Sequence, residues 1–414
     1  MASFSFDTGN ARKLARIPLY VLGRLVTALT PRGDRWVFGC GAGIADGPLA
    51  LWHAARSLGI DAVWLTTSRE EERDARQWGI PTLPKSSWRG FWATARARVA
   101  VVSHGFGDVN PYAVTGAFVA QLWHGIPLKR LGLDAPVMVT SSFLPDSRLV
   151  RRLLAWLYRR SAQRIGVLPA ASHLVRGRLE SAFGISDARI AVTGEPRVDV
   201  LSRGSAPARA ARAREVLRQA APALDTSRRI LLYAPTWRDG TADPGIPSAA
   251  EWMRIIALLE KHDAVLAVRS HRLGEGEYRP PVATDRIVSL GSDVLTDVTP
   301  ALPGFEALIT DYSSLAYDSA LVPLPALFLA PDVAEYARTR GFYGAYAAVA
   351  GDDVATTWRE LVPAIDRLLG QDEERERLAD RARALSRSVH DFHDGRNTFR
   401  VLDEIRRRIG KASP

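Results

Sequence analysis

The sequence predicts an α/β protein made of two doubly wound halves, and three observations support this. The chain has 414 residues, 47% of them hydrophobic, which is too long for one ordinary core. Short β-rich runs alternate with helical patterns from end to end, as in βαβ units with right-handed crossovers. Most of these runs are continuously apolar, which is typical of strands buried on both faces of a parallel sheet.

The predicted strands are distributed over both halves of the chain. In the first half they are Trp36–Phe38, Ala62–Leu65, Val99–Ser103, Phe118–Leu122, Val137–Thr140 and Ile190–Val192. In the second half they are Ile230–Tyr233, Val265–Val268, Ile287–Leu290, Leu308–Thr310 and Ala326–Leu329. Since such folds bind ligands at the carboxyl ends of strands, we expect functional residues directly after these runs.

The small, polar and turn-rich segment Ser202–Pro207 predicts the boundary between the halves. We expect residues 1–34 to form a basic amphipathic segment and residues 35–204 to form the first domain. Residues 205–375 are expected to form the second domain, and residues 376–414 to form helices that pack across both. A ligand is expected in the central cleft between the halves.

Composition and charge exclude several classes of protein. The Gly, Pro and charged contents are ordinary for a folded chain, which excludes collagen-like and pervasively disordered proteins. Cys40 is the only cysteine, which excludes an internal disulfide and a multi-thiolate zinc site and favours a reducing compartment. The net charge of +10, from 50 arginines and five lysines, favours anionic partners: phosphate, nucleic acid or acidic lipid.

Two segments combine basic and apolar residues in a helical pattern. They are Ala11–Leu29, which Pro18 is expected to kink or divide, and Ser147–Arg164. Such a helix, with Trp and Leu, can lie in a membrane interface, and the alternative is a surface helix packed on its own sheet. No run of 18 apolar residues is present, so no membrane-spanning helix is expected. Arg16 and Arg24 interrupt the apolar stretch that a signal peptide would need.

Five short segments after predicted strands carry residues suited to chemistry. In the first, residues 121–129, His124 follows a strand and precedes Gly and Pro, and its ordinary pKa suits proton transfer near neutral pH. The alternative is a structural histidine. In the second, residues 192–199, Arg197 either faces the cleft or pairs with Asp199 to hold the turn.

The third segment, residues 231–239, runs from a strand straight into Pro-Thr-Trp-Arg. The hydroxyl of Thr236 beside the guanidinium of Arg238 is a plausible anion cradle. The alternative is a turn in which Trp237 is buried and Arg238 pairs with Asp239.

The fourth and fifth segments favour phosphate. Arg269 and His271 leave one strand together, as a phosphate clamp or as a solvated cluster of charges. After another strand, Asp311, Ser313 and Ser314 precede a helical pattern, which predicts a capped helix N-terminus with free backbone N–H groups. The alternative is capping without any ligand.

Taken together, these segments resemble the CDP-glycerol glycerophosphotransferase family, the enzymes of teichoic-acid and related capsule polymer synthesis. The resemblance covers roughly residues 35–405, in the family's order. The matching motifs are Trp-His-Gly-x-Pro-Leu-Lys (123–129), Thr-Gly-x-Pro-Arg-x-Asp (193–199), Tyr-Ala-Pro-Thr-Trp-Arg (233–238), Arg-x-His (269–271) and Thr-Asp-Tyr-Ser-Ser (310–314). Glu195 departs from the pattern, which has a bulky or aromatic residue there, and Arg272 stands in place of Pro.

The resemblance implies a GT-B-like architecture with two Rossmann-like domains facing a central cleft. It implies transfer of glycerol phosphate, or another alditol phosphate, from a CDP-alditol to a hydroxyl of a lipid-linked polyol-phosphate acceptor, with release of CMP. The protein would lie peripherally on an anionic membrane surface at the cytoplasmic face. No cofactor is implied beyond the CDP-alditol substrate.

The resemblance also implies roles for individual residues. His124 would be the base that accepts the acceptor's proton, with Asp311 orienting or assisting. The donor's phosphates would be bound by Thr236, Arg238, Arg269, His271, Ser313 and Ser314. Lys129, Arg197 and Asp199 would hold the acceptor or line the cleft. No metal site is expected, because the one close group of His and Asp residues, at 390–394, is a weak metal signal near the chain end.

Two other functions are considered. A GT-B glycosyltransferase that uses a nucleotide sugar would share the fold and a histidine near the cleft, but it would form a glycosidic bond. A nucleic-acid-binding module would explain the charge of +10. No RNA- or DNA-binding motif is present, so no nucleic-acid partner is expected.

Overall fold

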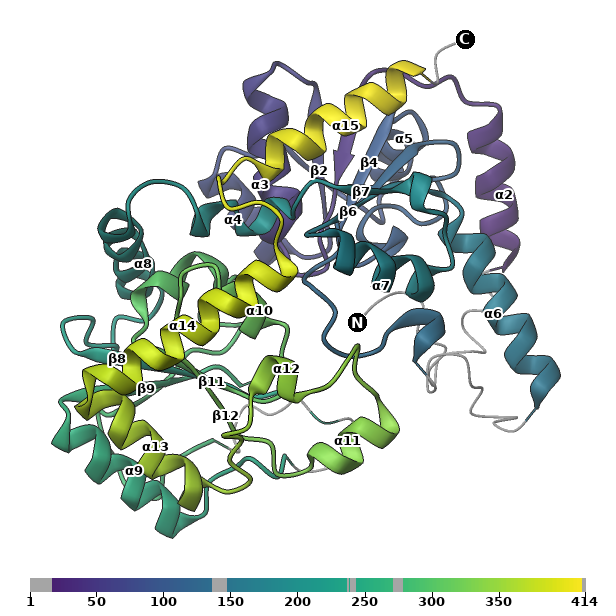
Figure 1. Cartoon of the computed structure of the whole chain (residues 1–414). Helices are drawn as coiled ribbons and strands as arrows, with labels where there is room; N and C mark the ends of the chain where they lie inside the picture. The colour runs from purple at the N-terminus through teal and green to yellow at the C-terminus, as the bar shows by residue number, and fades with distance from the viewer. Residues whose placement is uncertain (1–16, 136–146, 237, 239–242, 271–277, 412–414) are drawn as a thin grey trace. The chain divides into compact units, whose positions relative to one another are not determined.

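The computed structural model describes residues 17–135, 147–236, 238, 243–270 and 278–411 (Figure 1). The chain divides into two compact units. The first unit holds the described residues of 1–124, 130–199 and 396–414, and the second unit holds those of 125–129 and 200–395. Each unit is built on its own parallel sheet, as the sequence predicts.

The first unit has a seven-stranded sheet in the order β3-β2-β1-β4-β5-β6-β7, and every pair is parallel. The strands are β1 (Trp36–Phe38), β2 (Ala62–Thr66), β3 (Thr82–Pro84), β4 (Val99–Val102), β5 (Phe118–Gln121), β6 (Ile165–Ala170) and β7 (Ile190–Val192). The helices are α2 (Ile17–Ala28), α3 (Asp46–Ser57), α4 (Arg69–Gln77), α5 (Trp88–Ala95), α6 (Arg148–Ala162), α7 (His173–Phe183) and α15 (Asn397–Lys411).

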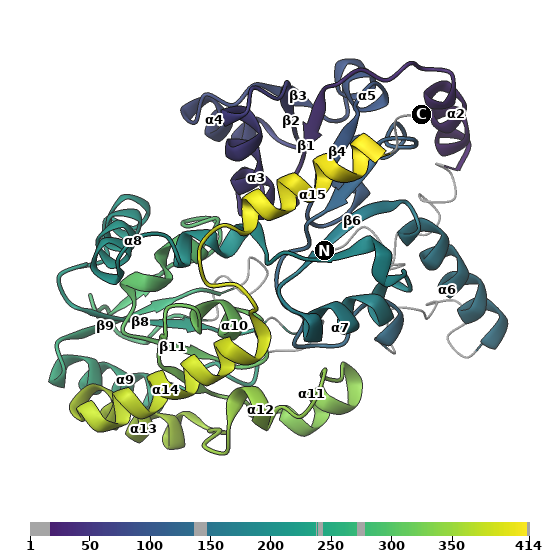
Figure 2. The same ribbon diagram turned by 45° about the horizontal axis from the view of Figure 1, so that its top comes forward.

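Large aromatic side chains fill the core of the first unit between the sheet and α3. Phe38 on β1 lies edge-on to Trp52, with ring centroids 5.2 Å apart, and stacks on Trp64 at 6.1 Å. The last helix, α15, packs on α3 and adds Val401, Leu402 and Ile405 to this core (Figures 1 and 2). The C-terminal helix therefore completes the first unit.

The second unit has a five-stranded parallel sheet in the order β10-β9-β8-β11-β12. The strands are β8 (Arg229–Ala234), β9 (Ala264–Val268), β10 (Ile287–Ser289), β11 (Ala307–Thr310) and β12 (Ala326–Phe328). The helices are α8 (Ala206–Ala220), α9 (Ala249–Lys261), α10 (Leu315–Ser319), α11 (Val333–Thr339), α12 (Ala347–Ala350), α13 (Trp358–Gly370) and α14 (Asp372–Val389). The helices α9, α13 and α14 cover one face of this sheet with an apolar core, and α8 packs on the 3₁₀ segment Thr299–Gly304.

The predicted strands are confirmed wherever the structure describes them, with ends that differ by at most one residue. The run Val137–Thr140 lies outside the described residues. Two strands, β3 and β6, were not predicted. β3 is a three-residue edge strand that ends at Pro84, and β6 contains Gly166 and Pro169, which interrupt the apolar pattern.

The two basic amphipathic segments form helices, α2 and α6. α2 turns its small residues inward: Gly23 and Thr27 are buried, whereas Leu19, Leu22 and Leu25 are each more than half exposed. A Cβ atom at position 23 would lie 2.5 Å from the carbonyl oxygen of Tyr112, so only glycine permits this close contact. Among the helices that the structure describes, none combines the length and apolarity needed to cross a bilayer.

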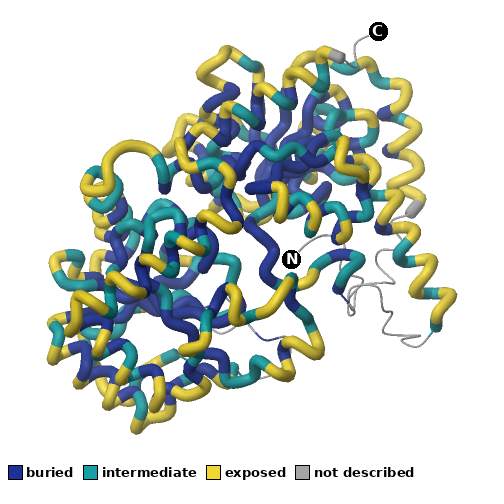
Figure 3. Tube along the Cα trace, in the orientation of Figure 1, coloured by how far each residue is buried: buried dark blue, intermediate teal, exposed yellow. Residues whose placement is uncertain are grey.

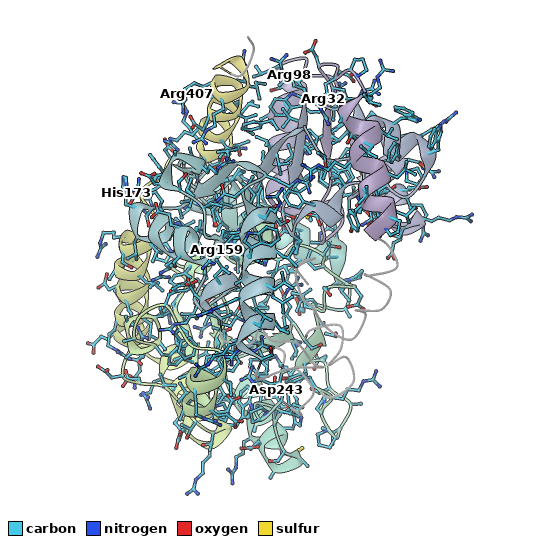
Figure 4. All side chains as sticks on the ribbon, turned by 90° about the vertical axis from the view of Figure 1, so that its right-hand side faces the viewer. Arg32, Arg98, Arg159, His173, Asp243 and Arg407 are labelled. Carbon is cyan, nitrogen blue, oxygen red and sulfur yellow. The ribbon has the colours of Figure 1, made fainter. Side chains whose placement is uncertain are left out.

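α6 is similarly exposed. Only Tyr158 and Ala162 of this helix are buried, and Leu149, Leu153 and Trp156 are each more than half exposed (Figure 3). Arginines alternate with these apolar side chains, among them Arg159, which is labelled on the helix in Figure 4.

Candidate active site

In both sheets the strand order reverses between two central strands, β1 and β4 in the first unit and β8 and β11 in the second. Loops that leave the carboxyl ends of strands at such a switch point form the ligand crevice of doubly wound sheets. We call the loops after β1, β4 and β5, up to His124, the first edge, and the loops after β8, β9 and β11, with residues 125–129 of the second unit, the second edge.

His124 lies on the first edge, three residues after the end of β5. The turn that presents it is strained, because the preceding Trp123 has φ +60°, in the left-handed region that non-glycine residues rarely adopt. Burial, the neighbouring His104 and the cation of Arg197 hold the pKa of His124 well below its usual value, against the opposite effect of a backbone hydrogen bond with Ser103. The imidazole is therefore neutral near pH 7 and able to accept a proton.

His104 is a second histidine on the first edge, and it stacks on His124. The two ring centroids are 4.3 Å apart and the ring planes differ by 3°. Burial lowers the pKa of His104 to about 4, so this ring is neutral as well. His104 was not singled out from the sequence, although Ser-His-Gly after β4 repeats the pattern of Trp-His-Gly after β5.

A carboxylate of the protein itself fills the loop after β4. Asp108 Oδ2 accepts hydrogen bonds from the backbone N–H groups of Ser103 and His104, at 2.9 and 2.7 Å. Converging backbone N–H groups of this kind form the phosphate-binding nest in many doubly wound folds. Here the nest is occupied, so it is not available to the phosphates of a substrate.

Arg197 and Asp199 lie in the first unit and have different partners. Arg197 Nε lies 3.5 Å from Glu195 Oε2 and 3.9 Å from Asp46 Oδ1. Asp199 Oδ1 accepts from the backbone N–H of Asn397, and Asp199 Oδ2 accepts from the N–H and the hydroxyl of Thr398. Asp199 thus caps the first turn of α15, a structural use of both its oxygen atoms.

Arg238 is the centre of the second edge. Its Nε and Nη2 atoms donate to the two oxygen atoms of Asp332, each at 2.9 Å, and its Nη1 donates to Asp311 Oδ2 at 2.9 Å. Burial alone would lower the pKa of Arg238, but the hydrogen bonds and charges of the two carboxylates outweigh it and raise the pKa. The predicted alternative pairing with Asp239 lies outside the described residues, and the pairing with Asp332 was not predicted, because Asp332 follows a different strand.

Asp311 joins the two central strands of the second sheet. Its Oδ1 accepts from the backbone N–H groups of Thr236, after β8, and of Tyr312, after β11. Its Oδ2 accepts from Arg238. Burial raises the pKa of Asp311, against the lowering effect of Arg238. Because hydrogen bonds already engage both oxygen atoms, the geometry favours an organising role over a catalytic one.

Aromatic rings surround the Arg238 side chain. The guanidinium lies 4.9 Å from the ring centroid of Tyr312 and 5.1 Å from that of Tyr336, within the range of cation–π contacts. Tyr312 also donates its hydroxyl to Asp332, and Tyr346 donates to the carbonyl oxygen of Asp311. These residues hold the carboxylate of Asp332 and the backbone of Asp311 as well as the cation.

Three hydroxyl residues of the predicted donor site lie on the second edge. The Thr236 Oγ1 atom is buried and has no hydrogen-bond partner among the described residues. Ser313 Oγ accepts from the backbone N–H of Leu315, and Ser314 precedes α10 without a side-chain capping bond. The predicted helix N-terminus is therefore present, but α10 has only five residues.

Lys129 belongs to the second unit, although the sequence places it in the predicted first domain. Its backbone bridges to Phe342, and the amine faces Asp311, Arg238 and Arg340. Burial, with the two arginines, lowers the pKa of Lys129 to about 8, against the raising effect of Asp311. Within the residues that the structure describes, no carboxylate lies at ion-pair distance from this amine.

Arg269 and His271 follow β9. The Arg269 guanidinium donates to three backbone carbonyl oxygens, of Leu290, Leu295 and Thr296, and so holds the loop after β10. Burial lowers its pKa. His271 lies outside the described residues. No group of three or more His, Cys, Asp or Glu side chains suited to a metal is found in the described part of the chain, and metal independence stays a prediction.

The buried pair of Arg238 and Asp311 yields a test of stability. Arg238→Met is expected to destabilise the second unit by about 3–5 kcal/mol, because it leaves buried carboxylate charge uncompensated. Adding Asp311→Asn should recover part of this loss, measured by chemical denaturation as a double-mutant cycle. Arg377→Met, which removes an exposed ion-paired arginine of α14, is the control and should cost about 1 kcal/mol or less. Simple addition of the two single losses would contradict the coupling.

Comparisons with known proteins agree with this architecture. The family model of CDP-Glycerol:Poly(glycerophosphate) glycerophosphotransferase matches residues 31–407. The teichoic acid glycerol-phosphate transferase of Staphylococcus aureus is 23% identical over 377 residues, which are 87% of this chain and 89% of that protein. The teichoic acid ribitol-phosphate primase of Bacillus spizizenii is 25% identical over 69% of this chain and 68% of that protein. Longer relatives are matched in part: the chain covers 42% of the ribitol-phosphate polymerase TarK of S. aureus.

Solved structures show the same fold. The wall teichoic acid polymerase TagF matches with a TM-score of 0.74 and 21% identity, over 98% of both chains. A TagF variant solved with CDPG matches with a TM-score of 0.75. These results confirm the GT-B-like fold and the resemblance noted from the motifs. The chain belongs to the CDP-glycerol:poly(glycerophosphate) glycerophosphotransferase family and is a transferase of that family.

Proposed function

We propose that the protein transfers glycerol phosphate, or another alditol phosphate, from a CDP-alditol to a hydroxyl group of a lipid-linked polyol-phosphate acceptor. The acceptor oxygen attacks the β-phosphorus, the bond from that phosphorus to the bridging oxygen breaks, and CMP leaves. The product is a phosphodiester in a teichoic-acid-like or capsule-like cell-surface polymer. The observation that carries the proposal is the match of the chain to the family model over residues 31–407, with the motif residues His124, Arg238 and Asp311 on the two edges.

The second edge has the properties of a site for the donor's pyrophosphate. Lys129 brings a positive charge that no described carboxylate neutralises at ion-pair distance, whereas Asp311 and Asp332 balance the charge of Arg238 and hold it in place. The buried Thr236 hydroxyl, without a partner among the described residues, is available to a ligand oxygen. Phosphoryl transfer depends mainly on such fixed positive charge and hydrogen-bond donors.

The first edge supplies the base in this proposal. His124 is neutral near pH 7, which is the form that accepts a proton from the attacking hydroxyl.

Four residues receive revised roles, and one of them, Lys129, moves from the predicted acceptor group to the donor site. We assign Asp311 to organising the second edge, because both its oxygen atoms are engaged, and Asp199 to capping α15. Arg269 fixes the loop after β10 through backbone carbonyls, and it affects the donor through that loop. The predicted roles at the donor phosphates are kept for Ser313, Ser314 and His271. The predicted role toward the acceptor is kept for Arg197.

We also propose that α2 and α6 attach the protein to an anionic membrane surface at the cytoplasmic face. A surface helix normally buries its large apolar side chains, and α2 instead buries glycine and threonine and exposes leucine. α6 exposes Leu149, Leu153 and Trp156 beside arginines. Exposed apolar side chains flanked by basic ones fit the interface of a bilayer that carries acidic lipid.

The first test concerns donor and base. CMP release from CDP-glycerol, or a close CDP-alditol, is expected only with a polyol-phosphate acceptor present. His124→Ala should slow transfer by about 10²–10⁴-fold, the usual contribution of a general base. Calorimetric titration should show donor affinity nearly unchanged, because the imidazole acts on the acceptor. Activity with nucleotide sugars and none with any CDP-alditol would favour the glycosyltransferase instead.

The second test concerns Lys129. Its amine is protonated below its pKa of about 8 and neutral above it. Donor affinity should therefore fall as pH rises through about 8, becoming about tenfold weaker at about pH 9 than at about pH 7. Lys129→Arg keeps the positive charge and should flatten this dependence, and Lys129→Met should weaken binding at both pH values. An unchanged pH profile in Lys129→Met would remove Lys129 from the donor site.

The third test concerns the membrane. Vesicles with acidic lipid should bind the protein, and added salt should weaken binding by screening the charges. Replacing Arg151, Arg152, Arg159 and Arg160 on α6 by Gln should weaken binding at least about tenfold, since each basic residue near the surface contributes about 1 kcal/mol. The same replacement of Arg209, Arg212, Arg214 and Arg218 on α8 is the matched control. Equal losses in both variants would mean that total charge, not α6, determines binding.

A further inference from the structure

The ends of two neighbouring strands bring two imidazoles together. β4 and β5 pair in parallel, with Val102 opposite Gln121, and each strand is followed by a short turn that carries His-Gly. His104 and His124 thus stack with centroids 4.3 Å apart and planes 3° apart. Parallel contact of two flat rings restricts the tilt of each of them.

The His104 ring is held from several sides. Its Nδ1 atom lies 2.8 Å from Ser103 Oγ, which lies 3.1 Å from the Sγ atom of the buried Cys40. Its backbone N–H donates to Asp108. On another side, a Cβ atom at Gly41 would lie 2.7 Å from His104 Cγ, so the glycine leaves room for the ring where it is.

One hydrogen bond of the His124 ring is with the backbone of Ser103. A catalytic imidazole is commonly aligned by a second hydrogen bond from its other ring nitrogen. Here Nδ1 of His124 is buried and has no hydrogen-bond partner among the described residues. Its ring contacts are with His104 and with Trp123, whose centroid lies 4.2 Å away at a tilt of 33°.

We propose that His104 is a positioning residue, whose ring, packed beside Gly41, aligns the ring of His124 through stacking. This inference rests on the proposed role of His124 as the base. The stacking face of His104, rather than its nitrogen atoms, performs the function. A neutral ring suits this position, because it does not add a full positive charge next to the proton that His124 accepts.

Three variants separate this role from others. His104→Ala removes the stacking ring. His104→Phe keeps a flat ring and removes both nitrogen atoms. Gly41→Ala changes neither histidine in the sequence, but the added Cβ atom displaces the His104 ring. The backbone of Gly41 is not in the left-handed region, so an alanine is tolerated there. Gly177→Ala on α7, where an added Cβ atom meets nothing within 4 Å, is the matched control.

Transfer kinetics with CDP-glycerol and a polyol-phosphate acceptor give the first readout. His104→Ala and Gly41→Ala are expected to lower kcat by about 10–10²-fold, the effect of misplacing a reacting group by about 1 Å, with the Kd of the donor unchanged. His104→Phe should recover most of the lost rate, and Gly177→Ala should match the wild type. If His104→Phe is as slow as His104→Ala, or if His104→Ala keeps full rate, the stacking role is wrong.

NMR of the histidine side chains, without substrate, gives a readout that does not depend on the proposed function. The His124 ring protons should lose the upfield shift from the stacked ring in His104→Ala and in Gly41→Ala, and retain it in His104→Phe. Unchanged His124 resonances in His104→Ala would overturn the inference. If instead the wild type releases no CMP, or His124→Ala keeps full rate, the proposed function fails, and the NMR result still shows whether His104 orients the ring.

Discussion

The arrangement of the second unit depends on one cation buried between two carboxylates. Arg238 follows β8, Asp311 follows β11 and Asp332 follows β12, so its ion pairs connect the carboxyl ends of three strands. Separating these charges would leave each of them poorly solvated, which penalises partly opened forms of this edge. The tyrosines that pack on the guanidinium extend the same constraint. A rigid edge of this kind presents its free groups, Lys129 and Thr236, in fixed directions.

The two switch points differ in their charge. In the first unit, Asp108 occupies the backbone nest after β4, and the groups near it are two neutral imidazoles. In the second unit, cations dominate, and the carboxylates among them already hold Arg238. The same topology thus produces one edge suited to moving a proton and one suited to holding phosphate. The two sheets have the same strand order around the switch point, so the strand order does not explain this division. The division follows from the side chains that the loops after the strands contribute.

The sequence was most informative where a local pattern determined the structure. Continuous apolar runs located nearly every described strand, and His124, Arg238 and Asp311 were found because each follows such a run. Pairings between distant loops were beyond this reasoning: Asp332 as the partner of Arg238, and Asn397 and Thr398 as the partners of Asp199, depend on how strands and helices pack. Arg269 was expected to face phosphate, and no local signal indicated the backbone carbonyls that it contacts. β6 was missed because Gly166 and Pro169 interrupt its pattern, and His104 because one Ser-His-Gly turn alone is a weak signal.

The path of the chain has a consequence for how such a protein can be rearranged. The chain changes unit four times, after His124, Lys129, Asp199 and Gly395, so neither unit is encoded by one continuous stretch. Exchanging the C-terminal half with that of a relative would transplant α15, which completes the first core, and would leave behind Lys129, which belongs to the second. Recombination at a single point therefore produces hybrids with mismatched parts in both units. Swapping one unit intact requires four simultaneous junctions, after residues 124, 129, 199 and 395, which favours inheritance of the two units as a single module.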